Sequence, residues 1–329
     1  MDTKALARAL QPKLIYYRRK FHQYPEVGWT EFWVSSKIAE ILMELGYDIK
    51  LGEQIIKEEA VMGSPSQDII TQEIQRAKDH GAHQDILKQM GTRTGVLGVL
   101  NTGRPGPTIA FRFDMDALNV SEAMEDVHTP FHEGFASMRQ GVMHACGHDG
   151  HMAVGLCLAE MLMGLKDSLS GTVKLIFQPA EEGVRGARAM VEKGLVDDVD
   201  YFFVFHLGFG SEDISIVAKT VGFLATSKLD VTYIGHPSHA SATPQEGKNA
   251  LLGAATAALN LHAIPPHSDG LTRINVGVLE AGSGANIVPD KAFMKIETRG
   301  ETSALNDYMR VKTINILKAS AQMYEIDYN

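Results

Sequence analysis

Short apolar segments of strand type alternate with helical segments between residues 95 and 205, and this alternation constrains the fold more than any other feature. Strands are predicted at 95–101, 107–114, 172–177 and 201–205, and helices at 151–165 and 187–193. A Gly-Arg-Pro-Gly-Pro turn separates the first two strands. Strands that alternate with helices are typical of an α/β fold, and we expect a mainly parallel sheet.

The pattern changes after residue 217. The remaining segments are a strand at 223–235, a helix at 249–262, strands at 272–279 and 292–299, and a long helix at 304–324. This order is that of a small open α+β sandwich of ferredoxin type. We therefore predict two domains, residues 1–217 and 218–329, which also suits a chain of 329 residues.

The region before the first strand is predicted to be helical. Apolar residues recur at helical spacing in 3–22 and again in 31–45, where Gly46 ends the second helix. Residues 52–93 are polar and poor in aromatic side chains, with partial helical periodicity. We interpret 52–93 as a helical insertion on the surface of the first domain.

Composition excludes several classes of function. The net charge is -9 and the pI about 5.8, so the chain offers no basic surface for nucleic acid. No apolar stretch is long enough to span a membrane, and the N-terminus is not a secretory signal. The only cysteines are Cys146 and Cys157, too few for a secreted disulfide scaffold. A cytoplasmic protein is expected.

Side chains that ligate metals gather in three short segments. Cys146 and His148 lie in a glycine-containing segment, 143–151, that precedes a predicted helix. Glu181 and Glu182 directly follow one predicted strand, and His206 follows another. Because sites in open α/β sheets form beyond the carboxyl ends of strands, we expect these groups to meet there.

A thiolate, imidazoles and a carboxylate together suit zinc, manganese or cobalt. One glutamate of the adjacent pair can bind the ion while its neighbour polarises a water. Taken singly, a cysteine or histidine in an apolar stretch is usually structural, and a Glu-Glu pair is usually a solvated face; the combination favours a metal site. A thiol enzyme, with Cys146 as nucleophile and His148 or His206 as base, is the alternative, but it leaves Glu181 and Glu182 without a role.

Three motifs, at 111–118, 144–149 and 178–183, resemble the M20 metallopeptidases, in the amidohydrolase branch with indole-acetyl-amino-acid hydrolases, hippurate hydrolases and aminoacylases. The insertion, with 185–190 and 286–289, is similar to the group acting on p-aminobenzoyl-glutamate. The resemblance implies a zinc-peptidase-like catalytic domain, an inserted ferredoxin-like dimerisation (lid) domain, and two divalent metal ions, Zn or Mn. The implied reaction splits an N-acyl or N-aroyl amino acid into acid and amino acid, in a homodimer or a heterodimer with a homologous subunit.

The resemblance also implies roles for individual residues of the first domain. The implied metal ligands are Cys146, His148, Glu182 and His206. Glu181 would be the general base and later the acid. Asp114 would orient a ligand imidazole and fix its tautomer. For Asp116 and Asp149 the resemblance leaves two readings open, partners of the active-site loops or residues that cap helices and turns.

The second domain carries a further signature of the family. His239, in the segment 235–240, matches a histidine that reaches the partner subunit's active site and stabilises the oxyanion there. Pro237 stands where relatives usually have a small residue. Asn286 and Arg299 match positions that hold the substrate carboxylate, for which a guanidinium fork is suited. A surface ion pair is the alternative for Arg299.

In the family, the chain returns to the catalytic domain after the inserted domain and supplies a last metal-binding histidine. Here the sequence stops about where that return begins, so we expect a truncated chain with an incomplete catalytic domain. A non-catalytic subunit or binding relative is therefore a second functional hypothesis. Trp29, Phe32 and Phe209 are candidates for stacking on an aryl group, although core packing is the favoured role for each.

Overall fold

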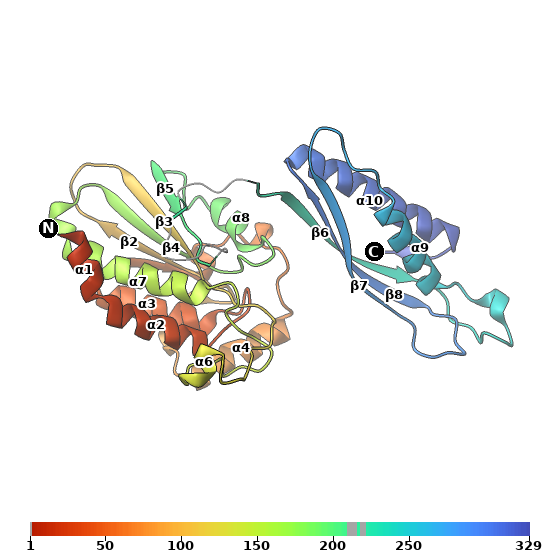
Figure 1. Cartoon of the computed structure of the whole chain (residues 1–329), viewed down its shortest axis with the longest axis horizontal. Coiled ribbons are helices and arrows are strands. Elements are labelled where there is room, and N and C mark those ends of the chain that lie inside the picture. The colour runs from red at the N-terminus through yellow and green to blue at the C-terminus, as the bar shows by residue number, and fades with distance from the viewer. Residues whose placement is uncertain (1, 209–215, 218–221) are drawn as a thin grey trace. The chain divides into compact units, whose positions relative to one another are not determined.

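The computed structural model describes residues 2–208, 216–217 and 222–329 (Figure 1). The chain divides into two compact units, Met1–Ile214 and Ser215–Asn329, each with a hydrophobic core of its own. The predicted domain boundary between 217 and 218 falls at the edge of the described residues, and Phe209 lies outside them. The assignment of a catalytic role to one domain and a lid role to the other stays a prediction.

Unit 1 is built on a five-stranded mixed sheet with the order β1-β2-β4-β3-β5. Its strands are β1 (Asp48–Leu51), β2 (Val96–Asn101), β3 (Thr108–Asp114), β4 (Thr172–Gln178) and β5 (Tyr201–Val204). β3 runs parallel to β4 and β5, whereas β2 is antiparallel to both β1 and β4. The α/β prediction is confirmed, with a sheet that is mixed rather than uniform in direction. β1, a short strand with polar residues, had no clear signal in the sequence.

The helices of unit 1 cover both faces of this sheet (Figure 1). They are α1 (Thr3–Ala9), α2 (Gln11–Gln23), α3 (Phe32–Glu44), α4 (Gln67–Asp79), α5 (Gln84–Met90), α6 (Thr129–His132), α7 (His148–Gly164) and α8 (Gly186–Val191), with 3-10 turns η1 (Gly52–Gln54), η2 (Glu58–Ala60) and η3 (Lys166–Ser168). Helices α3 and α7 pack on the main core, with side chains such as Phe32, Leu42 and Met152 fully buried. Helix α8 contributes Ala189 and Met190 to a second cluster on the opposite face.

Two expectations about the helices need correction. The predicted helix at 3–22 is two helices, because Pro12 lies in the first turn of α2 and favours a new helical start after Leu10. The segment 52–93 is helical as expected, but it is not only a surface insertion. Ile70 of α4 and Met90 of α5 are buried in the main core of unit 1, because one apolar face of each helix packs inward.

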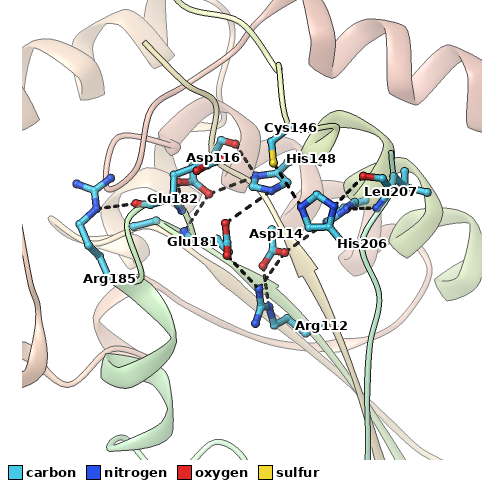
Figure 2. Close-up of polar contacts among 12 residues, drawn as sticks. Arg112, Asp114, Asp116, Cys146, His148, Glu181, Glu182, Arg185, His206 and Leu207 are labelled. Atoms are coloured by element: carbon cyan, nitrogen blue, oxygen red, sulfur yellow. Dashed lines mark hydrogen bonds and ion pairs between the residues drawn. The ribbon is translucent and has the colours of Figure 1, made fainter. Parts of the chain in front are cut away.

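The fold of unit 1 brings chain segments to one edge of the sheet. Strand β3 ends at Asp114, β4 ends at Gln178 just before the segment 179–183, and β5 ends shortly before His206. Because β3, β4 and β5 run in parallel, these three ends lie at the same edge. The first residue of α7, His148, lies at this edge as well, as the close-up in Figure 2 shows.

Unit 2 is a four-stranded antiparallel sheet with the order β7-β8-β6-β9. Its elements are β6 (Ala225–Ile234), η4 (Pro244–Glu246), α9 (Ala250–His262), β7 (Thr272–Ala281), β8 (Lys291–Gly300), α10 (Ser303–Met323) and β9 (Asp327–Tyr328). The βαββαβ order is of ferredoxin type. Apolar side chains of α9 and α10 bury Tyr233 and Met294 of the sheet. Among the described residues of both units, no helix has the length and apolar character needed to cross a membrane.

Candidate metal centre

Cys146, His148 and His206 lie together at the edge of the unit 1 sheet (Figure 2). One potential ligand atom from each lies within 4.8 Å of the other two, and the Cys146 Sγ atom is 3.4 Å from His206 Nε2. The turn before His148 depends on Gly147, whose φ of 86° lies in the left-handed region that favours glycine. A thiol and two imidazoles at this separation form a ligand set that suits zinc.

The two glutamates of the loop after β4 complete a second group around the same histidine. Ligand atoms of His148, Glu181 and Glu182 also lie within 4.8 Å of one another, and His148 Nε2 is 3.9 Å from a Glu181 oxygen. Among the described residues, the buried atoms His148 Nε2 and Glu182 Oε1 have no hydrogen-bond partner. Buried polar atoms without a partner are costly, and a metal ion bound by both atoms would remove that cost, so this set of side chains fits a divalent metal.

The orientation of His148 is set by the backbone of Asp116. His148 Nδ1 lies 2.7 Å from the Asp116 carbonyl oxygen, so Nδ1–H donates there and Nε2 faces the cluster. Burial alone would lower the pKa of His148, but the hydrogen bond to Asp116 and the nearby charges of Asp116 and Asp114 raise it to about 9. The ring that is shared by all three candidate groups is therefore fixed in position.

Asp116 also holds the loop that carries the two glutamates. Its carboxylate oxygens accept the backbone N–H groups of Glu181 at 2.9 Å and Glu182 at 3.0 Å. The side chain is almost fully buried, with 1 % of its surface exposed. One aspartate thus ties the His148 ring and the glutamate loop to the end of β3.

Asp114 has different neighbours from those expected. Arg112 donates to its two oxygens at 2.7 and 3.0 Å, and His151 Nδ1 lies 3.4 Å from it. Burial raises the pKa of Asp114, but these hydrogen bonds outweigh burial and lower it to about 2. Asp114 therefore orients His151, while the Asp116 carbonyl orients the predicted ligand His148.

His151 was not assigned a role from the sequence. Asp114, His148 and His151 form a third group whose ligand atoms lie within 4.8 Å of one another, all three buried. His151 Nε2 accepts the backbone N–H of Leu207 at 3.1 Å, which anchors the segment next to His206. The signal that could have revealed it is the spacing of three residues from His148, which places both rings on one face of α7.

The electrostatics of the cluster favour a cation. Burial, followed by the charges of Glu182, Glu181 and Asp116, raises the pKa of the Cys146 thiol to about 12. Burial and the Asp114 charge raise the pKa of Glu181. A thiol nucleophile needs a lowered pKa, so these surroundings do not support the thiol-enzyme alternative.

Asp149 is held in place by several partners. It accepts from the Gly150 N–H at 2.9 Å, from His22 at 2.8 Å and from Arg18 at 3.0 Å. These bonds connect the first turn of α7 to α2. Asp149 is therefore an anchor of the ligand-bearing turn, the first of the two readings that the sequence left open.

In unit 2, His239 and Asn286 lie on neighbouring segments. His239 pairs with Ile287 in an isolated bridge, and the Ala240 N–H donates to the Asn286 carbonyl at 3.0 Å. His239 Nδ1 accepts from the backbone of Ser241 and Ala242, each at 3.2 Å. Nε2 is therefore the ring nitrogen available to donate to a ligand, on an exposed side chain.

Arg299 lies at the other end of β8 from Asn286. Arg299 is eight positions after Lys291, where β8 begins, which corresponds to about 26 Å of strand. The Arg299 guanidinium is paired with Glu297 at 2.9 Å and is half exposed. Asn286 and Arg299 of one chain therefore cannot hold the same carboxylate.

The aromatic candidates fall into two sets. Trp29 and Phe32 are fully buried, with 0 % exposure, in the cores of unit 1. Both pack in the core, the role that the sequence favoured. Phe209 is outside the described residues.

Residues 110–324 of the chain match the Peptidase family M20/M25/M40. The chain is 49% identical to the indole-3-acetyl-aspartic acid hydrolase of Enterobacter agglomerans, over 96% of this chain and 73% of that protein. It is also 49% identical to one of the subunits of p-aminobenzoyl-glutamate hydrolase from Escherichia coli (strain K12), over 97% of this chain and 73% of that protein. The crystal structure of an aminobenzoyl-glutamate utilization protein from Klebsiella pneumoniae superposes with a TM-score of 0.85 at 44% identity, covering 100% of this chain and 77% of that one.

The fold and the cluster define a hydrolase of amide or peptide bonds with candidate ligands for metal ions. The chain belongs to the M20/M25/M40 peptidase family. The predicted family resemblance is confirmed.

Proposed function

We propose that this hydrolase cleaves an N-acyl or N-aroyl amino acid, of the p-aminobenzoyl-glutamate type, to an acid and an amino acid. The observation that carries the proposal is the pair Glu181 and Glu182 beside the buried, unpartnered Nε2 atom of His148. One carboxylate is available for a metal and the other for a proton. The names of the relatives at 49% identity, hydrolases of indole-acetyl-aspartate and p-aminobenzoyl-glutamate, support this class of substrate.

The residues proposed to hold two divalent ions, Zn or Mn, are Cys146, His148, Glu182 and His206. A soft thiolate combined with imidazole and carboxylate accepts either metal. These residues come from two candidate groups that have His148 in common. Ions bound there would lower the pKa of the attacking water and polarise the scissile carbonyl.

Glu181 is the proposed proton carrier. It is not needed as a ligand if Glu182 takes that role, and its carboxylate faces His148 and, at 3.8 Å, Arg112. A raised pKa suits a group that must accept a proton from water and then donate it to the leaving amine. Asp116 accepts its backbone N–H, which fixes the point from which the side chain extends.

The residues of unit 2 complete the proposal. His239 would donate Nε2–H to the carbonyl oxygen as negative charge develops there. Asn286 lies beside His239 and far along β8 from Arg299. In any one active site, His239 and Asn286 would therefore come from one chain and Arg299 from the other. Arg299 would exchange its contact with Glu297 for the substrate carboxylate.

This division of labour requires a second chain. A homodimer or a heterodimer with a homologous subunit is proposed. The name of the Escherichia coli relative describes that protein as one of the subunits of a hydrolase, which supports a second chain here. Location in the cytoplasm stays a prediction.

Release of p-aminobenzoate from p-aminobenzoyl-glutamate tests the proposal directly. The chain is assayed with Mn²⁺ or Zn²⁺, by itself and together with a homologous partner chain. Glu181→Ala is expected to keep its metal and to lose turnover by about 100- to 10,000-fold, the range for a general acid–base group.

Glu182→Ala is the matched variant, one residue away and with the same chemical change. It is expected to lose metal as well as turnover, because Glu182 is a proposed ligand. Equal metal loss in the two variants would refute the separate roles of the glutamates.

A further inference from the structure

The loop 179–183, which carries Glu181 and Glu182 and is called the glutamate loop below, has three consecutive backbone N–H groups that donate to two buried carboxylates. Asp116 accepts the N–H groups of Glu181 and Glu182. The preceding residue, Ala180, donates its N–H to Glu31 Oε1 at 2.7 Å. Glu31 lies 149 positions earlier in the sequence and is fully buried, with 0 % exposure.

Glu31 stands next to the N-terminus of α3 but does not cap that helix. The free N–H groups of Trp33 and Val34 are accepted instead by Glu26, at 3.2 and 2.9 Å. One oxygen of the Glu31 carboxylate accepts the Ala180 N–H, and the other accepts the Thr94 hydroxyl at 2.6 Å. The side chain is therefore free to serve the glutamate loop and is held there from two sides.

The loop at Ala180 has an unusual backbone that needs such support. Ala180 has a φ of +49°, in the left-handed region that is unfavourable for a residue with a Cβ. Neighbouring backbone lies close: a Cβ added to Gly28 would stand 3.0 Å from Ala180 Cα, and one added to Gly95 would stand 3.0 Å from Pro179. This conformation turns the chain so that Glu181 and Glu182 leave β4 toward the cluster.

We propose that Glu31 is a positioning residue of the active site, which holds the Ala180 turn and thereby sets the direction of Glu181 and Glu182. The inference rests on the proposed roles of these two glutamates. Glu31 touches neither substrate nor metal ligand side chains. It acts through one backbone hydrogen bond, from Ala180, next to the two that Asp116 accepts from Glu181 and Glu182.

The test compares Glu31→Leu with Glu26→Leu. Both changes replace a buried glutamate near the start of α3 with an apolar side chain, but only Glu31 contacts the loop. Amide hydrogen exchange of the peptide covering 179–183 is measured in the metal-free chain, Mn²⁺ affinity by titration, and kcat and KM with p-aminobenzoyl-glutamate.

In Glu31→Leu, exchange in 179–183 is expected to speed up at least about 10-fold, since the Ala180 N–H loses its acceptor. Mn²⁺ affinity and kcat are each expected to fall about 10- to 100-fold, the usual effect of losing a partner behind a metal site, with KM within about 3-fold. Glu26→Leu is expected to leave exchange in 179–183 and Mn²⁺ affinity unchanged. Glu31→Gln, whose amide oxygen can still accept from Ala180, is expected to restore most of the affinity and kcat.

A folded Glu31→Leu chain with unchanged exchange and Mn²⁺ affinity would overturn the inference, as would equal effects in Glu26→Leu. The exchange and affinity measurements do not require turnover, so they decide the question even for a chain without activity. Failure of the proposed function has a different signature, which is full turnover in Glu181→Ala. At saturating Mn²⁺, where the weaker metal affinity that acts through Glu182 no longer limits the rate, a Glu31→Leu/Glu181→Ala double variant should be no slower than Glu181→Ala alone, because the remaining effect of both changes is on Glu181.

Discussion

The two units of this chain treat polar groups in opposite ways. Unit 1 buries histidines and carboxylates, among them Glu31, Asp116 and His148. In unit 2 the buried polar side chains of the described residues are all uncharged: Thr272, Thr298, Asn306, Thr313 and Ser320. The proposed functional residues of unit 2, His239, Asn286 and Arg299, are exposed.

Because of this difference, the site residues of unit 1 can be fixed before a ligand binds, whereas those of unit 2 can move when it binds. A buried charge is costly unless it is paired, and buried residues of unit 1 such as Asp116 and His148 are held in position by hydrogen bonds. Exposed residues have no such constraint, and Arg299 can exchange one carboxylate partner for another. The comparison predicts that metal binding depends on unit 1 alone and that unit 2 affects turnover and substrate affinity.

The largest expected effect comes from His148, the residue common to the three candidate groups. His148→Ala is expected to abolish metal binding and to lower kcat/KM at least about 1,000-fold, because the metal supplies several kcal/mol of transition-state stabilisation. Metal analysis of the purified variant checks this. His262→Ala, an exposed histidine of α9, is the control and should keep its metal. Full metal content in His148→Ala would contradict a metal site centred on His148 in unit 1.

His239 is expected to affect turnover without affecting metal binding. His239→Ala should reduce kcat about 100-fold, the cost of losing one donor to a developing oxyanion, while metal content stays unchanged. Steady-state kinetics with metal analysis measures both. His236→Ala, three residues away and also exposed, should behave like the unmodified chain. If metal were lost together with turnover in His239→Ala, the two units would not have separate roles.

Arg299 should affect substrate affinity more than turnover. Arg299→Ala is expected to raise KM about 10- to 100-fold, because a charge-assisted hydrogen bond contributes about 1.5 to 3 kcal/mol. The measurement is repeated with a substrate amide that lacks the α-carboxylate, for which both proteins should have the same KM. A KM increase that persists with this second substrate would remove Arg299 from carboxylate recognition.

The pH dependence of stability should arise in unit 1. Burial raises the pKa of Glu26 from its ordinary 4.5 to about 7, despite the nearby Arg76. The folded state then holds this proton up to higher pH than the unfolded state. The contribution of Glu26 to the free energy of unfolding is therefore largest below pH 4.5 and falls as pH rises from about 4.5 to 7.

Glu26→Gln should remove that slope, which amounts to roughly 2 to 3 kcal/mol across the window. Urea unfolding at pH 4.5, 6 and 7.5 measures it. Glu40→Gln, a partly exposed glutamate of α3, should keep the slope of the unmodified chain. Parallel pH profiles for Glu26→Gln and the unmodified chain would show that Glu26 stays ionised.

Much of the fold follows from local sequence patterns. Apolar runs marked β2, β3, β4 and β8, and helical periodicity marked α3 and α10, because each pattern reflects one face against a core. Strand direction could not be read in the same way. β2 is antiparallel to β4, and that arrangement depends on contacts between distant segments, not on its own residues.

In the candidate site, too, residue type and local position could be predicted from the sequence, whereas contacts between distant segments could not. Cys146, His148, Glu182 and His206 could be predicted as ligands because they are recognisable residue types, placed after predicted strands or just before a predicted helix. Glu31 was not found, since a single glutamate before a helix reads as a cap, and only the structure brings it to Ala180, 149 positions away. The incompatible placement of Asn286 and Arg299 on one chain likewise becomes visible only from their positions along β8.

Titration of Zn²⁺ or Mn²⁺ into the metal-free chain is the most direct test of whether unit 1 holds a metal centre. We expect metal binding that is lost in His148→Ala and retained in His239→Ala. A chain that binds no ion, or one whose binding is unaffected by His148→Ala, would contradict a metal centre at Cys146, His148, Glu182 and His206.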